Sequence, residues 1–340
     1  MKLSYSLYLC LFLCAHYATS QTTINLFIPD LDENKVDKLE VFDYSQIEMR
    51  TPEIKDSLLI KFPRNTVDCY IIRATIGARS FYRQVWLDPG VNTVKAHIAK
   101  NNLVVDTVIA GISGTPVHYK INQFNDGYTS SLKKDTAATN AYLLKSFKEH
   151  IENPFSITIG LYYLLLNINS KENLLKLHQL SAAHRDKFKW YILHTSLYDR
   201  LDFLIKQNKL DWSKFKFFNI DNKLKEIETD KSDFLIVQFW FTRNRLSLQD
   251  HMSLLGLVPV FKSKSAHLVS ISIDQDYANW KKYIETTKLN WPQYMENKVN
   301  LVTDFLYIDN FPTYMILDQK GNIIKTYFAL NQVKDHFGIK

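Results

Sequence analysis

The chain has 340 residues, of which 46% are hydrophobic and 14% aromatic, and its formal net charge is +7. This apolar content supplies sizeable cores and excludes a disordered chain, and the length exceeds that of one typical domain. The basic excess forms no tight Lys/Arg cluster, so the charge argues against nucleic-acid binding and favours at most a weak preference for acidic surfaces.

Residues 1–20 have the pattern of a secretory signal peptide. Lys2 precedes an apolar run from Leu7 to Ala15, and Ala18-Thr19-Ser20 resembles a cleavage site with small residues. The run is too short to span a bilayer, so no integral membrane segment is predicted after cleavage. We expect an exported protein, periplasmic or secreted. A lipoprotein is the second choice, because Cys14 lacks the small residue expected just before a lipidated cysteine.

Cysteine usage limits the redox chemistry of the mature chain. The three cysteines are Cys10, Cys14 and Cys69, and cleavage after residue 20 removes the first two. A single remaining thiol forms no internal disulfide. Cys69 lies in the run VDCYII and is expected to be a buried strand residue, with a reactive thiol as the alternative.

Residues 21–128 predict a β domain. Short apolar alternations recur along this segment, and turn signals such as Pro63-Arg64-Asn65 and Asp88-Pro89-Gly90 separate them. Many short strands without a helical period are typical of an antiparallel β-sandwich.

Residues 129–210 predict a helical segment. Asn153-Pro154 separates two helical stretches, and Phe155 to Asn167 is nearly all apolar. One apolar stripe contains Leu174, Leu177 and Leu180, and a second contains Phe188, Ile192, Leu197, Leu201 and Leu204. We expect both stripes to pack in cores; a functional groove is the alternative.

Residues 211–340 alternate strands and helices, as in an α/β domain. The predicted elements are a strand Phe234–Phe239, a helix Leu248–Phe261 that Pro259 should end or kink, a strand His267–Ile273, a crossover helix Asp276–Lys288, and strands Tyr314–Leu317 and Ile323–Tyr327. Phe239 and Trp240, at the end of the first strand, are expected to be core residues.

The order of motifs in this segment is FW after a strand, then the strand SISID, Pro312-Thr313 before a strand, and the turn Asp318 to Gly321. It resembles that of the TlpA/ResA-type thiol–disulfide oxidoreductases, which are related to AhpC/TSA proteins. The resemblance implies a thioredoxin-like fold. It also implies that Asn244 and Ser247 occupy the positions of the two cysteines in the C-x-x-C motif, and that Gln238 replaces a buried acid.

The N-terminal segment resembles the uncharacterised β domain that precedes such thioredoxin-like units. The features that carry this looser resemblance are the strand Tyr70-Ile71-Ile72, the turn from Trp86 to Gly90, and Gly111 and Gly114 before a helix.

The residues at the implied active site lack the groups that disulfide exchange requires. That reaction needs an attacking thiolate and a second thiol that resolves the mixed disulfide. Asn244 and Ser247 supply neither, and Gln238 does not titrate. We therefore predict a non-catalytic binding or interaction module. The alternative is a thiol–disulfide oxidoreductase or peroxidase-related enzyme of cell redox homeostasis, with Cys69 as its only thiol.

The same resemblance implies a candidate binding groove. Arg243 and Arg245 would flank an exposed helix N-terminus, which suits an anionic ligand; solvated loop charges are the alternative. In the family, the proline at the position of Pro312 is cis, and the backbone of its neighbour, here Phe311, pairs with an extended peptide. These four residues are the candidate groove for a peptide or protein partner, unless Pro312 only shapes its loop.

The sequence indicates no other chemistry. It contains no HExxH metal spacing and no GxxxxGK[ST] phosphate loop, so we predict neither a metal site nor a cofactor. Ser247 and His251 are four residues apart on the expected helix, but without a third orienting group they do not predict a catalytic pair.

Overall fold

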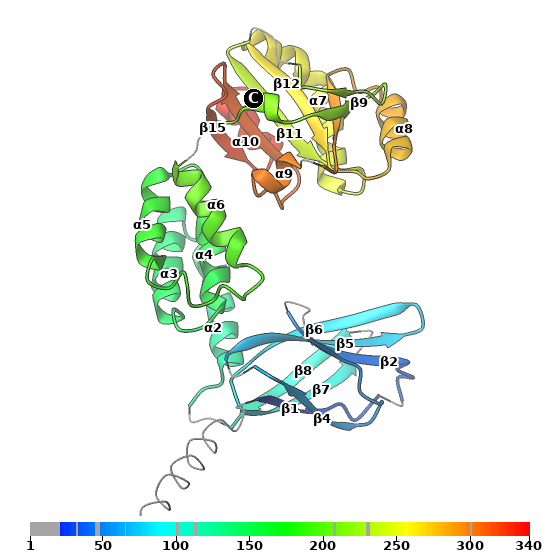
Figure 1. The fold of residues 1–340 in the computed structure, drawn as a ribbon, viewed down its shortest axis with the longest axis vertical. Helices are drawn as coiled ribbons and strands as arrows, with labels where there is room; N and C mark the ends of the chain where they lie inside the picture. The colour runs from blue at the N-terminus through cyan, green and yellow to red at the C-terminus, as the bar shows by residue number, and fades with distance from the viewer. Residues whose placement is uncertain are drawn as a thin grey trace, which may run out of the picture. The chain divides into compact units, whose positions relative to one another are not determined.

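The computed structural model describes residues 21–340 except 32, 45–47, 65, 100–101, 112–113, 207–208, 229–231 and 300, so the predicted signal peptide lies outside it. The described chain divides into two compact units. Figure 1 draws their helices and strands, coloured by residue number. One contains the described residues up to Leu166 and Ala183–His194, and the other contains Asn167–Ala182 and Thr195–Lys340.

The first unit begins with two four-stranded sheets, one in the order β4-β1-β7-β8 and the other in the order β3-β2-β5-β6 (Figure 1). Their strands are β1 Thr22–Phe27, β2 Lys38–Asp43, β3 Met49–Arg50, β4 Ser57–Phe62, β5 Asp68–Ile76, β6 Arg79–Leu87, β7 Val91–Ala99 and β8 Asn102–Ala110. The predicted β-sandwich is confirmed, but one pairing is not antiparallel, because β1 and β7 run parallel.

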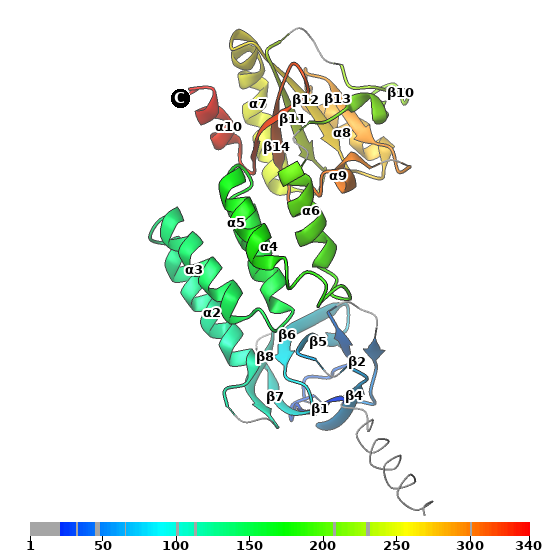
Figure 2. The same ribbon diagram turned by 60° about the vertical axis from the view of Figure 1, so that its left-hand side comes forward.

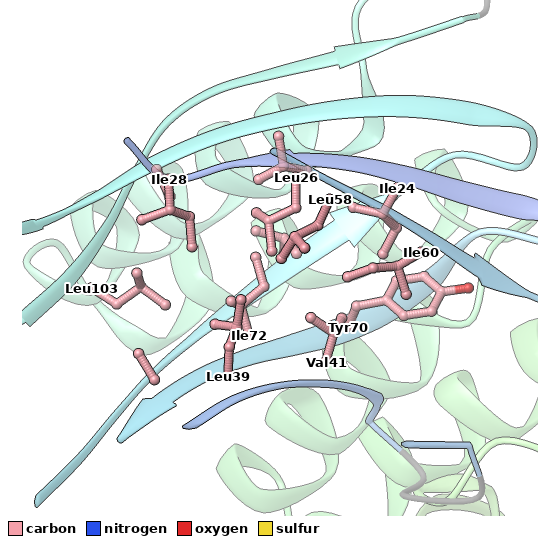
Figure 3. Close-up of a cluster of buried hydrophobic side chains, with 14 of the residues drawn as sticks. Ile24, Leu26, Ile28, Leu39, Val41, Leu58, Ile60, Tyr70, Ile72 and Leu103 are labelled. Atoms are coloured by element: carbon pink, nitrogen blue, oxygen red, sulfur yellow. The ribbon is translucent and has the colours of Figure 1, made fainter. Parts of the chain in front are cut away.

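Alternation of side chains builds the core between these sheets. In β4, each second residue is buried, because successive side chains of a strand point to opposite faces. Ile24 and Ile60 from one sheet meet Val41 and Ile72 from the other, as Figure 3 shows. Burying this apolar surface is what stabilises the pair of sheets.

Three helices complete most of the first unit: α2 Val117–Leu132, α3 Thr136–Glu149 and α4 Phe155–Leu166. The helices begin at Val117, well before the predicted boundary at residue 129. The side chain of Asp135 caps α3 by accepting a hydrogen bond from the Ala138 amide at 2.7 Å. Although α4 is nearly all apolar, no helix in the described ranges has both the length and the apolar character needed to cross a membrane.

The second unit begins with α5 Lys171–Ser181 and α6 His194–Lys206. The helical segment predicted at 129–210 therefore divides between the two units and does not form one of its own. Leu174 and Leu177 are buried as predicted, but the second apolar stripe does not follow one helix. Its first members, Phe188 and Ile192, precede α6, and Ile192 is 51% exposed.

The rest of the second unit is a seven-stranded sheet with helices (Figure 2). Its strand order is β10-β9-β13-β12-β11-β14-β15. The elements are β9 Phe217–Asn219, β10 Leu224–Lys225, β11 Phe234–Trp240, α7 Arg245–Ser263, β12 Ala266–Ser272, α8 Tyr277–Thr287, β13 Gln293–Glu296, α9 Val302–Phe305, β14 Thr313–Asp318, β15 Ile323–Tyr327 and α10 Leu330–His336. The α/β fold predicted for 211–340 is confirmed.

Apolar side chains cover both faces of this sheet. Residues of α7, α8 and α10 pack on the face that carries Trp240, and α9 packs on the face that carries Phe239. Both side chains are fully buried, as predicted. The helix α7 continues through Pro259 to Ser263, so of the two expected effects of this proline, ending or kinking the helix, the first does not occur.

Candidate functional site

The start of α7 is organised by the side chain of Asn244. Asn244 is the N-cap residue, and its Oδ1 accepts hydrogen bonds from the Ser247 amide at 2.8 Å and from Ser247 Oγ at 3.0 Å. An amide oxygen at this position satisfies a backbone N–H that has no partner within the helix. The two positions that the resemblance assigns to cysteines therefore hold a helix cap and the group that it caps.

Asn244 also joins α7 to the loop before β14. Its Nδ2 donates to the carbonyl oxygen of Phe311 at 3.1 Å. The peptide bond between Phe311 and Pro312 is cis, and Pro312 is buried. The ring of Phe311 packs edge-on against Phe241 with their centroids 5.3 Å apart. The structure thus brings Asn244, Ser247, Phe311 and Pro312 together.

Two further contacts, which the sequence did not reveal, position these loops. Thr242 donates its amide and its hydroxyl to the carboxylate of Asp274, at 2.9 and 2.7 Å. In the loop before β14, Asp309 accepts a hydrogen bond from Arg200 of α6 at 3.1 Å, and Arg200 is almost fully buried. Asp274 lies two residues beyond the last residue of β12, and this placement at the carboxyl end of a parallel strand was a usable signal.

Arg243 and Arg245 flank Asn244 and are both exposed. Neither makes an ion pair with any residue that the structure describes. Leu246, between Arg245 and Ser247, is 59% exposed. The surface at the start of α7 is therefore positive and partly apolar, which agrees with the predicted exposure of the two arginines.

A buried polar network lies behind this surface, centred on Gln238 of β11. Gln238 Oε1 accepts from Ser270 Oγ at 2.7 Å and lies 3.1 Å from His251 Nε2, and Gln238 Nε2 donates to the Tyr314 hydroxyl at 3.1 Å. Because an amide oxygen only accepts, His251 Nε2 carries the proton. The Tyr314 hydroxyl in turn donates to Asp250 at 2.7 Å.

The same network accounts for both ring nitrogens of His251. With Nε2 protonated, Nδ1 accepts from the Tyr283 hydroxyl at 3.1 Å. Burial lowers the pKa of His251 to about 4, so the ring is neutral at pH 7. The hydroxyl–imidazole pair considered for Ser247 and His251 is not formed, because these hydrogen bonds direct the two groups to other partners.

Cys69 lies in β5, within the first unit, and is 1% exposed. Burial raises the pKa of its thiol, and the neighbouring Asp68 carboxylate raises it further. The thiolate is therefore disfavoured, as expected for a buried strand residue. Over the described residues, no group of three or more His, Cys, Asp or Glu side chains is arranged to bind a metal ion.

Residues 232–323 match the model of a thioredoxin-like family. The C-terminal domain is thioredoxin-like. No curated protein matches the chain.

Three similar solved structures each align with 36% of this chain. They include a thiol:disulfide interchange protein from Bacteroides sp., 22% identical over 86% of that chain with a TM-score of 0.33. StoA from Bacillus subtilis is 21% identical over 93% of its chain, with a TM-score of 0.31. A thiol-disulfide oxidoreductase from Bacteroides fragilis is 19% identical over 95% of its chain, also with a TM-score of 0.31.

Proposed function

We propose that the thioredoxin-like domain performs no dithiol–disulfide exchange and binds an extended polypeptide segment. The observation that carries this proposal is the side chain of Asn244, which caps α7 and donates to the Phe311 carbonyl. Both of its polar atoms have structural partners, and an amide cannot attack a disulfide. Ser247, at the second position, donates its hydroxyl to the same amide.

The alternative function, an enzyme of thiol–disulfide exchange, would depend on Cys69. Its thiol is buried and its raised pKa disfavours the nucleophilic thiolate. A single thiol also lacks the partner that resolves a mixed disulfide. The geometry therefore favours binding over catalysis.

The binding surface proposed here consists of Phe241, Arg243, Arg245, Leu246 and Phe311. The two phenylalanine rings are half-buried, Leu246 is exposed, and the arginines carry positive charge at the positive end of the α7 dipole. This combination suits a polypeptide with apolar and acidic side chains. The export predicted from residues 1–20 belongs to the same proposal, and protein recovered from the cell envelope should begin near Gln21.

An insulin-reduction assay tests the absence of exchange activity. The wild type should not accelerate the reduction of insulin by dithiothreitol. The double variant Asn244→Cys with Ser247→Cys should form a disulfide in air and accelerate the assay, because the helix N-terminus and the two arginines lower the pKa of the first thiol. Acceleration by the wild type would refute the proposal. If the variant folds but its thiols never pair, the assignment of the cysteine positions is wrong.

A binding assay tests the proposed surface. The probe is an unfolded polypeptide made acidic by carboxymethylation of its cysteines, titrated against the full chain. Replacing Arg243 and Arg245 together by Gln should weaken binding several-fold and reduce its salt dependence. Lys262→Gln, a charge removal at the other end of α7, is the matched control and should leave binding unchanged. If the double arginine variant and Lys262→Gln bind the probe equally well, the start of α7 is not part of the binding surface.

A further inference from the structure

A cavity in the first unit lies where the edge strands of its two sheets meet the start of α2. β6 ends the order β3-β2-β5-β6, β8 ends the order β4-β1-β7-β8, and both β8 and α2 contact β6. Figures 1 and 2 both draw these three elements side by side. The cavity has a volume of about 530 Å³, which lies within the range of small-molecule sites. Its lining consists of Tyr82, Arg83 and Gln84 of β6, Val105 of β8, and His118 and Asn122 of α2.

The polar side chains of this lining carry no negative charge. They are a tyrosine, an arginine, two amides and a histidine, and neither Asp nor Glu is among them. Arg83 is exposed, and it forms no ion pair and no hydrogen bond with any residue that the structure describes. Arg73 of the neighbouring strand β5, by contrast, is paired with Glu40 at 2.7 Å. Arg83 therefore brings to the cavity a positive charge that no described carboxylate neutralises.

His118 supplies a second hydrogen-bond donor beside Arg83. Its Nε2 lies 3.2 Å from Asn122 Nδ2. Burial lowers the pKa of His118, and the nearby positive charge of Arg83 lowers it further, so the ring is neutral at pH 7. Because an amide nitrogen only donates, Nε2 accepts from Asn122 and Nδ1 carries the proton. This Nδ1–H group has no hydrogen-bond partner among the described residues.

The first turn of α2 is tied to the β-sandwich, so the place of His118 at the cavity is fixed. The Val117 amide donates to the carboxylate of Asp88 at 2.9 Å, and the Tyr119 hydroxyl accepts from the Val108 amide at 3.0 Å. These bonds hold the two residues that flank His118. A site whose walls are in place before the ligand arrives loses little conformational freedom on binding.

We propose that this cavity binds a small carboxylate whose body is a single ring. A planar guanidinium donates two parallel hydrogen bonds to a carboxylate, and no described residue occupies these donors of Arg83. One positive charge, with no acid in the lining, neutralises a monoanion, whereas a phosphate dianion carries one charge more than the lining offers. Tyr82, which is 67% exposed, and Val105 supply ring and apolar surface against which the body of the ligand packs.

Isothermal titration of the full chain with two carboxylates and their neutral amides tests the requirement for charge. The pairs are benzoate with benzamide and D-glucuronate with D-glucuronamide, which present an apolar and a hydroxylated ring. At least one carboxylate should bind saturably, and its own amide should bind at least tenfold more weakly, because the amide loses the charge-assisted hydrogen bonds to Arg83. The stronger of the two carboxylates identifies the kind of ring that the cavity accepts. Inorganic phosphate should bind more weakly than that carboxylate.

Two variants of exposed arginines in β6 locate the site. Arg83→Gln should weaken binding of the carboxylate at least tenfold. Arg79→Gln, which removes the same charge outside the lining, is the matched control and should leave the affinity unchanged. Both side chains are exposed, so both variants should keep the melting temperature of the wild type.

Four results would overturn the proposal. The first is the absence of saturable binding of both carboxylates at millimolar concentration, and the second is equal affinity for each carboxylate and its amide. The third is tighter binding of inorganic phosphate than of either carboxylate. The fourth is equal affinity of Arg83→Gln and Arg79→Gln, which would place any binding elsewhere on the chain. The first three comparisons use the wild type and decide the question even if a variant fails to fold.

Discussion

A polar row of directly paired residues crosses the sheet from Gln238 of β11 through Ser270 of β12 to Gln293 of β13. Gln238 and Gln293 lie two strands apart in this row, yet their side chains differ in every hydrogen bond. Gln238 uses its oxygen for Ser270 and His251 and its nitrogen for Tyr314, whereas both polar atoms of Gln293 lack partners among the described residues. A buried amide stabilises a fold only when its partners replace the water it has lost. We infer that Gln238 contributes to the stability of the domain through its hydrogen bonds, whereas the polar atoms of Gln293 contribute little to it.

The comparison also bears on the positions that the resemblance assigns to an active site. The resemblance places an acid at Gln238, and a carboxylate there would offer acceptors to all its neighbours. The amide instead donates to Tyr314, which leaves the Tyr314 hydroxyl free to donate to Asp250. Gln238 therefore fixes the direction of the hydrogen bonds through the core, behind Asn244 and Ser247, the positions that the resemblance assigns to cysteines.

The largest effect is expected from Gln238→Met. The substitution conserves volume but leaves the His251 Nε2–H and the Ser270 hydroxyl without an acceptor, at about 1–3 kcal/mol for each group. We expect the domain to lose about 4 kcal/mol of its free energy of unfolding. Hydrogen exchange of the β11 and β12 amides in the full chain measures this loss.

Gln293→Met is the matched control for that experiment. It makes the same chemical change on the other side of Ser270 in the polar row. It should keep or increase the protection of the same amides, because the substitution removes two buried polar atoms that have no partners among the described residues. If the two variants destabilise the domain equally, the distinction between the hydrogen-bonded and the unpartnered glutamine fails.

A second effect arises from pH, through His251. Its pKa in the folded state is about 4, below its ordinary value of 6.5. Between these values the unfolded chain binds a proton that the folded domain does not, so stability falls as pH decreases from about 6.5 to about 4. The loss attributable to His251 is up to about 3 kcal/mol.

Urea unfolding of the wild type and of His251→Gln at several pH values measures this contribution. The variant retains an amide that donates to Gln238 but has no group that titrates in this range, so its stability should fall less. His184, whose pKa burial also lowers to about 4, and Asp250, whose pKa burial raises, are present in both proteins. The difference between the two proteins in how the free energy of unfolding changes with pH therefore isolates His251. If that free energy changes with pH equally in both proteins, His251 is not the cause.

The sequence predicted those features of the fold that depend on local patterns. The strand Phe234–Trp240 and the crossover helix after Asp276 carry their own periodicity and capping residues, and both form as predicted. The parallel pairing of β1 with β7 depends on distant segments, and no local pattern records it. The division of the helices between two units is non-local in the same way.

The residues of the candidate site were predictable from the sequence only in part, as the fold was. Asn244, Ser247, Phe311 and Pro312 were found from motif order, and they do lie together. The polar row was not found, because Gln238, Ser270 and Gln293 each appear as a single polar residue in or beside an apolar strand. Only the register of the strands places them next to one another.

The smallest effect is expected at Asn244, where two roles of one side chain can be separated. Asn244→Ala removes the cap of α7 and should lower the free energy of unfolding by about 1 kcal/mol. Asn244→Asp keeps the capping oxygen, and its charge is favourable at the helix N-terminus beside Arg243 and Arg245. It loses the donor to Phe311, however, so α7 should stay protected from hydrogen exchange while residues 309–312 exchange faster than in the wild type.

Because the polypeptide surface includes Phe311, the Asp variant should also weaken binding of the carboxymethylated probe. If both variants leave the exchange of residues 309–312 unchanged, the hydrogen bond from Asn244 does not fix this loop, and the first observation behind the proposed function is removed.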